Sequence, residues 1–260
     1  MFRNIEFKFK FQQLNSKLLY QRMGQLTSMG LSMKTDFEKF DWFQQAKTLS
    51  TAEISDALDA FDLPGSVLGI QSVAGPEKLF GFAFTIRFAP IDRDQPGTVG
   101  DFIDTLTPGT VVVLDNGGRL DCTVWGGILS RLAAHKGMGG TVVHGVCRDT
   151  SEAVEAGYPL YANGKFMRTG KDRVQVEAFE QPVKLGDVRV VPGDLVVGDA
   201  DGIVVVAQSR IQEVLTKALQ TREIEEKIMS AALSGMALSA ARQQFNYHTL
   251  QRAPSSKLTV

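Results

Sequence analysis

The sequence predicts an α/β fold, because stretches with strand periodicity alternate with stretches of helical periodicity through the middle of the chain. The runs VVVLD (111–115) and TVVHG (141–145) are short, apolar and rich in β-branched residues, as buried strands are. A pattern of helical spacing follows each run. Strands that alternate with helices in this way are typical of parallel sheets.

The composition is that of a folded protein without a strongly charged surface. With 260 residues, 43% hydrophobic and 22% charged, the chain is long enough for one sizeable domain with appended segments. The 28 Lys and Arg residues nearly balance the 29 Asp and Glu residues, which gives no support for a nucleic-acid or anionic-membrane partner. No stretch reaches the roughly 18 apolar residues of a membrane helix. Only Cys122 and Cys147 are cysteines, which is typical of a reducing compartment, so we expect a cytoplasmic protein.

The first half of the chain is predicted to begin with a capped amphipathic helix over residues 50–62, which opens with Ser50 and Thr51. A strand and a turn are expected within residues 65–76. Residues 81–89 alternate phenylalanine or isoleucine with smaller or polar residues, which indicates a strand. A short helix over 101–106 should precede the buried strand 111–115.

The second half continues the alternation. Glycines stop a helix predicted over 124–135, and the next buried strand leads to a short helix that ends by Ala156. From Val174 the chain is predicted to be β-rich, and from Ser209 to Ala240 to form one long polar-faced helix. We divide the chain into an N-terminal extension (1–33), which we expect to be partly ordered, a main domain (34–242) and a loose C-terminal tail (243–260).

Arg148 and Asp149 are the first candidates for chemistry, because they follow the strand 141–145 and should emerge together at its end. A carboxylate there suits Mg²⁺, which takes one or two protein carboxylates and leaves its other positions to water and substrate. An adjacent arginine can bind a substrate carboxylate and stabilise enolate charge. The alternative is that Asp149 is only the N-cap of the following helix.

Two glycine-containing segments are further candidates. Gly126, Gly127, Ile128 and Leu129 open a helix, where free backbone N–H groups favour an anion; alternatively the glycines only allow close packing. The segment DNGG, which begins at Asp115, is either a simple turn or part of a site at the same sheet edge.

The histidines and cysteines give weaker signals. His144 lies near the end of a buried strand, where a hydrogen-bonded core histidine is the expected role. His135 and His248 lack partners at metal-binding spacing. Cys147 lies beside Arg148, and we expect a buried, inert thiol.

Taken together, the segments LDNGG, WGGILSRLAAHKGMGGTVVHGVCRDTSEAVEAGYPLYANG and VVPGDLVVGDADGIVVV resemble the family that contains 4-hydroxy-4-methyl-2-oxoglutarate aldolase and the RraA regulators of ribonuclease activity. The resemblance covers roughly residues 51–240. It implies a layered β/β/α sandwich of the swivelling-domain type with a long C-terminal helix. It also implies homotrimers that can pair into hexamers, with a site at the subunit boundary.

For the site, the resemblance implies that Asp149 holds Mg²⁺ or Mn²⁺ and that Arg148 meets the substrate. Backbone amides of residues 126–129 would bind the pyruvyl carboxylate. The implied activity is a class II aldol cleavage of a 4-hydroxy-2-oxo acid, with oxaloacetate decarboxylation through the same pyruvate enolate as a second activity. The partner is then a small oxo acid and a second copy of the chain.

Two positions differ from the family pattern or cannot be assigned to it from the sequence. Some aldolases carry an acidic residue where this chain has Gly127, which puts the proton relay and the substrate in question. A glutamate from the C-terminal helix of a neighbouring subunit is expected in some members; Glu223 or Glu226 could supply it, and a solvated helix face is the simpler interpretation.

Two alternatives to the aldolase remain. The chain could be a non-catalytic regulator that binds a ribonuclease, although the regulators tend to lack the aspartate found here as Asp149. It could also be an enzyme of the same scaffold that acts on another oxo acid or a sugar acid.

Overall fold

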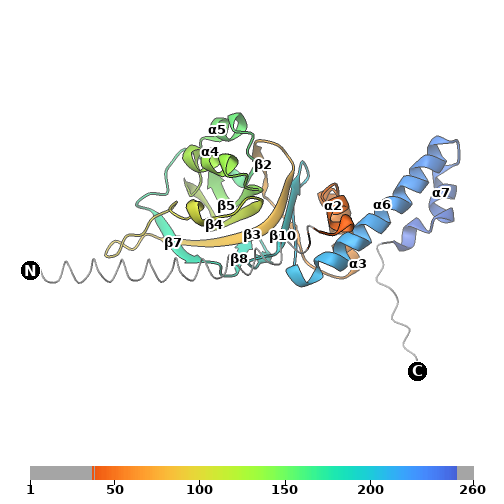
Figure 1. The fold of residues 1–260 in the computed structure, drawn as a ribbon, viewed down its shortest axis with the longest axis horizontal. Coiled ribbons are helices and arrows are strands. Elements are labelled where there is room, and N and C mark those ends of the chain that lie inside the picture. Colours follow the sequence, from red (N-terminus) through yellow and green to blue (C-terminus); the bar gives the residue numbers. More distant parts are fainter. Residues whose placement is uncertain (1–36, 38, 251–260) are drawn as a thin grey trace, which may run out of the picture.

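The computed structural model describes residue 37 and residues 39–250, which form a mixed α/β fold with one large sheet, a small second sheet and flanking helices (Figure 1). The large sheet has the strand order β1-β11-β10-β3-β4-β5-β6-β2, and β7 pairs with β3. The strands are β1 (Ser66–Val67), β2 (Gln71–Ala74), β3 (Leu79–Pro90), β4 (Thr110–Thr123), β5 (Gly140–Cys147), β6 (Leu160–Lys165), β7 (Val174–Phe179), β8 (Val183–Leu185), β9 (Val188–Val190), β10 (Leu195–Asp199) and β11 (Gly202–Val206). The predicted α/β class is confirmed.

Helices cover the sheet at two places. They are α2 (Asp41–Ala46), α3 (Thr51–Ala60), α4 (Gly127–His135), α5 (Thr150–Glu155), α6 (Ile211–Leu233) and α7 (Leu238–Gln244), with the 3₁₀ turns η1 (Ile103–Thr105), η2 (Gln208–Arg210) and η3 (Tyr247–Thr249). In Figure 1, α4 and α5 lie together over β4 and β5, whereas α2, α3 and α6 lie at the other end of the sheet.

The centre of the sheet is parallel. β3 pairs with β4, β4 with β5, and β5 with β6, all in the same direction. Parallel strands have their carboxyl ends at one edge of the sheet, so the segments that follow β4 and β5 lie next to each other there.

The sheet has an apolar layer on each face, because side chains alternate along its strands. On one face Val112 and Leu114 pack in a cluster that includes Ala133 of α4 and Ala153 of α5. On the other face the intervening residues of β4 pack against the hairpin β8–β9. The resulting order of hairpin, sheet and helices confirms the predicted layered β/β/α sandwich.

A third apolar cluster joins α2, α3 and α6 to β10 and β11. Leu195 and Val197 of β10 contribute one side of it, and Leu215 of α6 contributes to the other. Beyond this cluster α6 continues away from the sheet with α7 beside it, as Figure 1 shows.

The predicted helix cap at Ser50 is confirmed as a reciprocal capping box. The Ser50 hydroxyl accepts a hydrogen bond from the Glu53 backbone N–H (3.2 Å), and the Glu53 carboxylate accepts one from the Ser50 N–H (2.7 Å). Thr51 at the first turn donates from its N–H and its hydroxyl to the Asp199 carboxylate, both at 2.6 Å. The start of α3 is therefore fixed to the end of β10.

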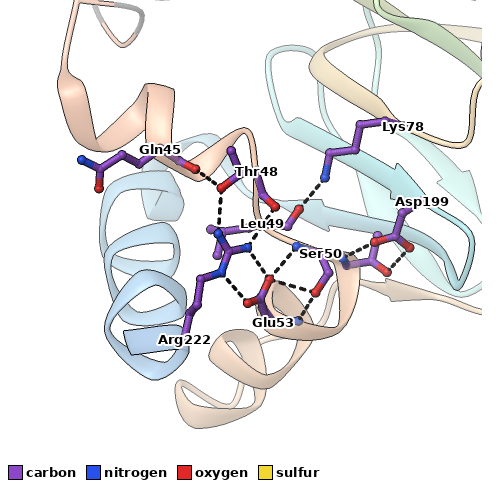
Figure 2. Close-up of polar contacts among 9 residues, drawn as sticks. Gln45, Thr48, Leu49, Ser50, Glu53, Lys78, Asp199 and Arg222 are labelled. Carbon is purple, nitrogen blue, oxygen red and sulfur yellow. Dashed lines mark hydrogen bonds and ion pairs between the residues drawn. The ribbon is translucent and has the colours of Figure 1, made fainter. Parts of the chain in front are cut away.

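The same glutamate also binds the long helix, as Figure 2 shows. Arg222 of α6 donates to Glu53 Oε1 from Nε at 2.5 Å and to Oε2 from Nη2 at 2.6 Å. Its guanidinium also donates to the Thr48 hydroxyl (2.7 Å) and carbonyl (2.9 Å). Side chains of Arg222 and Glu53 are only 24% and 19% exposed, so this bidentate pair is partly shielded from solvent.

The structure corrects four sequence predictions. The long helix predicted over 209–240 is two helices, because Gly235 adopts φ +98°, a conformation that ends α-helices. The strand predicted to end at Asp115 continues as β4 through Thr123. The helix expected over 101–106 is the shorter 3₁₀ turn η1, and the segment 65–76 contains two short strands, β1 and β2.

The predicted terminal segments are described in part. Residues 1–33 and 251–260 lie outside the described part of the chain. Within the predicted tail, α7 ends at Gln244 and η3 follows. The boundaries at residues 33 and 242 stay predictions. Among the described residues no helix combines the length and the apolar character needed to span a bilayer.

We predict that Arg222→Ala lowers the free energy of unfolding by about 2 kcal/mol, because it removes hydrogen bonds to a partly buried carboxylate. The control is Lys227→Ala on the same helix, which removes an exposed pair with Glu223 and should have a clearly smaller effect, because solvent screens exposed ion pairs. Urea unfolding of both variants measures the difference. Equal effects would contradict the structural importance of the Arg222–Glu53 pair.

We predict a pH-dependent stability from Glu180, since burial raises the pKa of its carboxyl to about 7 from 4.5. The folded state keeps a proton that the unfolded chain releases, so this group stabilises below its unfolded pKa and loses that contribution as pH rises through the folded pKa. Glu180→Gln should therefore gain stability relative to the wild type between about pH 5 and about pH 8. Thermal unfolding across this range tests it; a constant difference would refute the prediction.

Candidate active site

A cleft with a volume of about 670 Å³ lies where β4 and β5 end. Four segments of the chain form its walls, namely residues 97–101, 123–129, 148–152 and 169–172. The residues predicted from sequence all line it: Gly126, Gly127, Ile128, Leu129, Arg148 and Asp149. The tertiary structure therefore brings the two predicted motifs into one site.

A buried tryptophan fixes the segment that follows β4. Trp125 is 1% exposed and its ring stacks on that of Tyr158, with centroids 6.0 Å apart. The indole N–H donates to the Ser130 hydroxyl (2.9 Å), which in turn donates to the Gly126 carbonyl (3.1 Å). These hydrogen bonds hold the first turn of α4 against the buried Trp125. Binding sites need such support to keep their donor groups in position.

The segment that follows β5 is bonded directly to this anchored turn. The Arg148 N–H donates to the Trp125 carbonyl at 3.1 Å. The Asp149 Oδ2 atom accepts from the Gly127 N–H, also at 3.1 Å. Asp149 has φ +55°, a left-handed conformation that is uncommon for residues other than glycine. Aspartate adopts this region more readily than most residues, and Asp62 and Asn246, outside the cleft, do the same.

The N-cap interpretation of Asp149 is confirmed for its position but not for its side chain. Asp149 does occupy the N-cap position of α5, but its side chain makes no capping hydrogen bond there. Its carboxylate accepts from α4 instead, and the side chain is 41% exposed. One oxygen is therefore engaged by the protein while the group borders the cleft.

The start of α4 supplies backbone donors. The first N–H groups of any α-helix lack intrahelical acceptors, and here the Gly127 N–H is taken by Asp149. The N–H groups of Ile128 and Leu129 follow it in the same turn. These two are the donors that an incoming carboxylate can use, with the helix dipole in its favour.

At the two glycines, a side chain would displace neighbouring side chains rather than strain the backbone. Gly126 has φ −153°, which any residue adopts. A Cβ atom on it would lie 2.8 Å from Asp149 Oδ2 and 3.3 Å from Arg148 Nε. A Cβ atom on Gly127 would lie 2.5 Å from Glu152 Oε1. Both glycines therefore make room for acidic side chains of the opposite segment.

Sequence reasoning missed Glu152 and the outer walls of the cleft. Glu152 stands three residues after Asp149, a spacing that places two residues on the same side of a helical turn and could have identified it. Lys171 and Asp172 join the cleft because Thr123 of β4 forms a bridge with Thr169. No local pattern indicates this second contact, since it arises from pairing of distant segments.

The charges in the cleft are of both signs. The Nε atom of Arg148 lies 3.4 Å from Asp149 Oδ2, and both side chains are about 40% exposed. Below them, Cys147 is fully buried, and burial raises the pKa of its thiol to about 12. The thiol is therefore protonated and inert at neutral pH, as its sequence context predicted.

The donor set at Asp149 fits Mg²⁺ or Mn²⁺. The Asp149 carboxylate borders the cleft. The Oε2 atom of Glu152 accepts no hydrogen bond, although Arg131 Nε lies 2.9 Å from it as an ion-pair partner. Within residues 37 and 39–250 no three His, Cys, Asp or Glu side chains gather as a complete metal cage. One or two carboxylates with water and substrate oxygens are the usual ligands of Mg²⁺.

Asp115 does not belong to the cleft. Its Oδ1 atom lies 3.0 Å from His144 Nδ1, and its Oδ2 atom accepts from the Lys184 N–H at 3.0 Å. Burial raises the pKa of Asp115, but these hydrogen bonds outweigh it and hold the pKa below its usual value. The pair links β4, β5 and β8, and the predicted role of His144 as a hydrogen-bonded residue is confirmed.

The two glutamates considered on the long helix lie outside this cleft. Glu223 forms an exposed ion pair with Lys227 at 2.7 Å. Glu226 lies on the same helix, α6. The exposed pair at Glu223 agrees with the simpler interpretation of a solvated helix face.

Comparison with known proteins identifies the family. The family model described as "RraA-like: Aldolase/RraA" matches residues 51–205. The protein DlpA of Legionella pneumophila is 38% identical over 208 residues, which are 78% of this chain but only 34% of DlpA. A protein of Halalkalibacterium halodurans named "Putative 4-hydroxy-4-methyl-2-oxoglutarate aldolase" is 30% identical, and the match covers 75% of this chain and 90% of that protein.

Solved structures agree with this relationship. An uncharacterised protein from Pseudomonas syringae pv. tomato superposes with a TM-score of 0.71 and 37% identity, covering 76% of this chain and 95% of that one. Streptomyces coelicolor RraAS2, described as an unusual member of the RNase ES inhibitor RraA family, has a TM-score of 0.64 and 29% identity over 70% of this chain and 93% of its own. With the fold and the family model in agreement, the chain belongs to the RraA-like family.

Proposed function

We propose that the protein is a divalent-metal-dependent class II aldolase that cleaves a 4-hydroxy-2-oxo acid, such as 4-hydroxy-4-methyl-2-oxoglutarate, to pyruvate and a second oxo acid. The observation that carries the proposal is the convergence of Asp149, Arg148 and the start of α4 on one cleft. The name of the Halalkalibacterium relative supports the same activity. Decarboxylation of oxaloacetate to pyruvate is proposed as a second activity.

Substrate binding would use the donors at the cleft. The N–H groups of Ile128 and Leu129 would receive the carboxylate next to the 2-oxo group, because they open α4. Arg148 would orient the substrate and hold negative charge on the enolate oxygen. Asp149 would hold Mg²⁺ or Mn²⁺, which supplies Lewis-acid polarisation of the 2-oxo group when bound.

In the proposed reaction a base, such as a water molecule in the cleft, takes the proton of the 4-hydroxyl group as the C3–C4 bond breaks. The bonding electron pair moves to the C2 oxygen as an enolate, and C4 becomes the carbonyl carbon of the released oxo acid. Protonation at C3 then yields pyruvate. Loss of CO₂ from oxaloacetate gives the same enolate, which is why one site can perform both reactions.

The competing proposal is a regulator that binds a ribonuclease, and it rests on the naming of solved neighbours such as RraAS2. A binding role alone does not call for the placement of Asp149 and Arg148 together on the cleft. An enzyme of the same scaffold for another oxo or sugar acid is compatible with this geometry. The first proposal is therefore tested with the two substrates named above.

We predict that pyruvate forms only with added Mg²⁺ or Mn²⁺ and that EDTA abolishes its formation. Asp149→Asn should reduce kcat/KM by about a hundredfold or more, because it removes the carboxylate charge that is proposed to hold the cation. Lactate dehydrogenase and NADH report pyruvate from either substrate, with a metal-only reaction as the background. Circular dichroism confirms that the variant folds.

If metal-replete protein turns over neither substrate, the aldolase proposal is refuted. Binding of a ribonuclease in a pull-down would then favour the regulator. Turnover that survives Asp149→Asn would instead refute the assignment of this carboxylate.

We predict that Gly126→Ala lowers kcat/KM by roughly tenfold to a hundredfold without unfolding the protein, because a misplacement near 1 Å can cost that much. The new Cβ would lie 2.8 Å from Asp149 Oδ2 and displace it, while φ −153° suits alanine. The matched control is Gly164→Ala, whose Cβ would meet only Val146 Cγ1 at 3.9 Å. Equal kcat/KM for both variants would contradict the placement of Asp149.

A further inference from the structure

Glu152 has a position that its own helix does not explain. It lies on α5, and a Cβ atom added to Gly127 of α4 would meet all three atoms of its carboxyl group at once. The carboxyl group therefore fills the space that a side chain at position 127 would occupy. Because Gly127 is the first residue of α4, this space borders the proposed site.

Glu152 and Asp149 reach this space together. The Glu152 N–H donates to the Asp149 carbonyl at 3.1 Å, so one tight turn connects the two residues. A Cβ atom on Gly126 would meet Asp149, just as one on Gly127 would meet Glu152. Two carboxylates from one turn thus lie against two consecutive glycines of the opposite segment.

The carboxylate of Glu152 is incompletely satisfied. Its Oε2 atom is buried and accepts no hydrogen bond. Arg131 Nε lies 2.9 Å away and provides charge compensation, but not in hydrogen-bonding geometry. The Glu152 side chain as a whole is 38% exposed, so its carboxylate can accept further hydrogen bonds from the water ligands of a cation in the cleft.

We propose that Glu152 supplies a second carboxylate to the divalent-cation site of Asp149, from the space that a side chain at position 127 would otherwise take. The inference rests on the proposed function, which places the cation at Asp149. Glu152 acts as a positioning residue that orients the cation's water ligands. Outer-shell partners of this kind typically contribute 10-fold to 100-fold to metal affinity.

The test measures Mn²⁺ binding to the full chain by calorimetry and by the electron paramagnetic resonance signal of free Mn²⁺. Glu152→Gln and Glu152→Ala should raise the Kd by tenfold or more. Arg131→Ala, which removes the ion pair but keeps the carboxylate, should leave the Kd within threefold of the wild type. The double variant G127D/E152A returns a carboxylate to the same space and should recover the Kd to within threefold.

The outcomes separate this inference from the proposed function. If Asp149→Asn abolishes Mn²⁺ binding while Glu152→Gln binds as the wild type does, the cation site stands and the inference is overturned. If Asp149→Asn also binds normally, the cation site and hence the proposed function fail. Loss of affinity in Arg131→Ala equal to that in Glu152→Gln would assign the effect to the ion pair and overturn the inference.

Two controls keep the result interpretable. Thermal unfolding followed by circular dichroism checks every variant, and the isosteric Glu152→Gln decides the matter if Glu152→Ala does not fold. Failure of G127D/E152A to recover affinity, when it folds, would show that a carboxylate in this space is not what the cation requires and would overturn the inference.

Discussion

Parallel pairing of β4 with β5 joins the two halves of the candidate site, which are 22 residues apart in the sequence at Gly127 and Asp149. β4 has 14 residues and β5 has 8. With regular pairing alone, the C-terminal end of β4 would therefore extend beyond the C-terminal end of β5. Two register shifts in β4 absorb the excess length and bring Thr123 opposite Val146. Gly117 and Gly118, with φ of +63° and +68°, allow this departure from regular strand geometry. The matched ends then let Arg148 donate to Trp125.

Two separate apolar clusters pack the two ends of the sheet. Trp125, Tyr158 and the apolar face of the central strands form the support beneath the cleft. The helices α2, α3 and α6 pack in a separate apolar cluster on β10 and β11, reinforced by the partly buried pair of Arg222 and Glu53. β3 contributes side chains to both clusters, because it lies between β10 and β4.

Within the cleft, the lack of side chains at Gly126 and Gly127 determines how closely the acidic residues can approach α4. Gly126 and Gly127 allow the turn that carries Asp149 and Glu152 to approach the start of α4. That approach gives the Asp149 carboxylate its N–H donor from α4 and leaves the next two N–H groups of the helix for a ligand. In the proposed aldolase this arrangement places carboxylate-binding donors, an arginine and an acidic group around one reacting carbon skeleton. Membership of the RraA-like family is consistent with that arrangement and also with partners other than small molecules.

The sequence by itself determined the α/β class, the capped helix at Ser50 and the residues that follow the two buried strands, because periodicity and capping are local properties of a chain. It also indicated that Arg148, Asp149 and the glycines at 126–127 would emerge at strand ends. Only the tertiary structure decided that Asp115 pairs with His144 away from the cleft, that Asp149 bonds to α4 rather than capping α5, and that Glu152 lies against Gly127. Each of these depends on which residues face one another across strands and helices distant in the sequence. Such contacts follow from strand register and packing, which no local pattern of residues specifies.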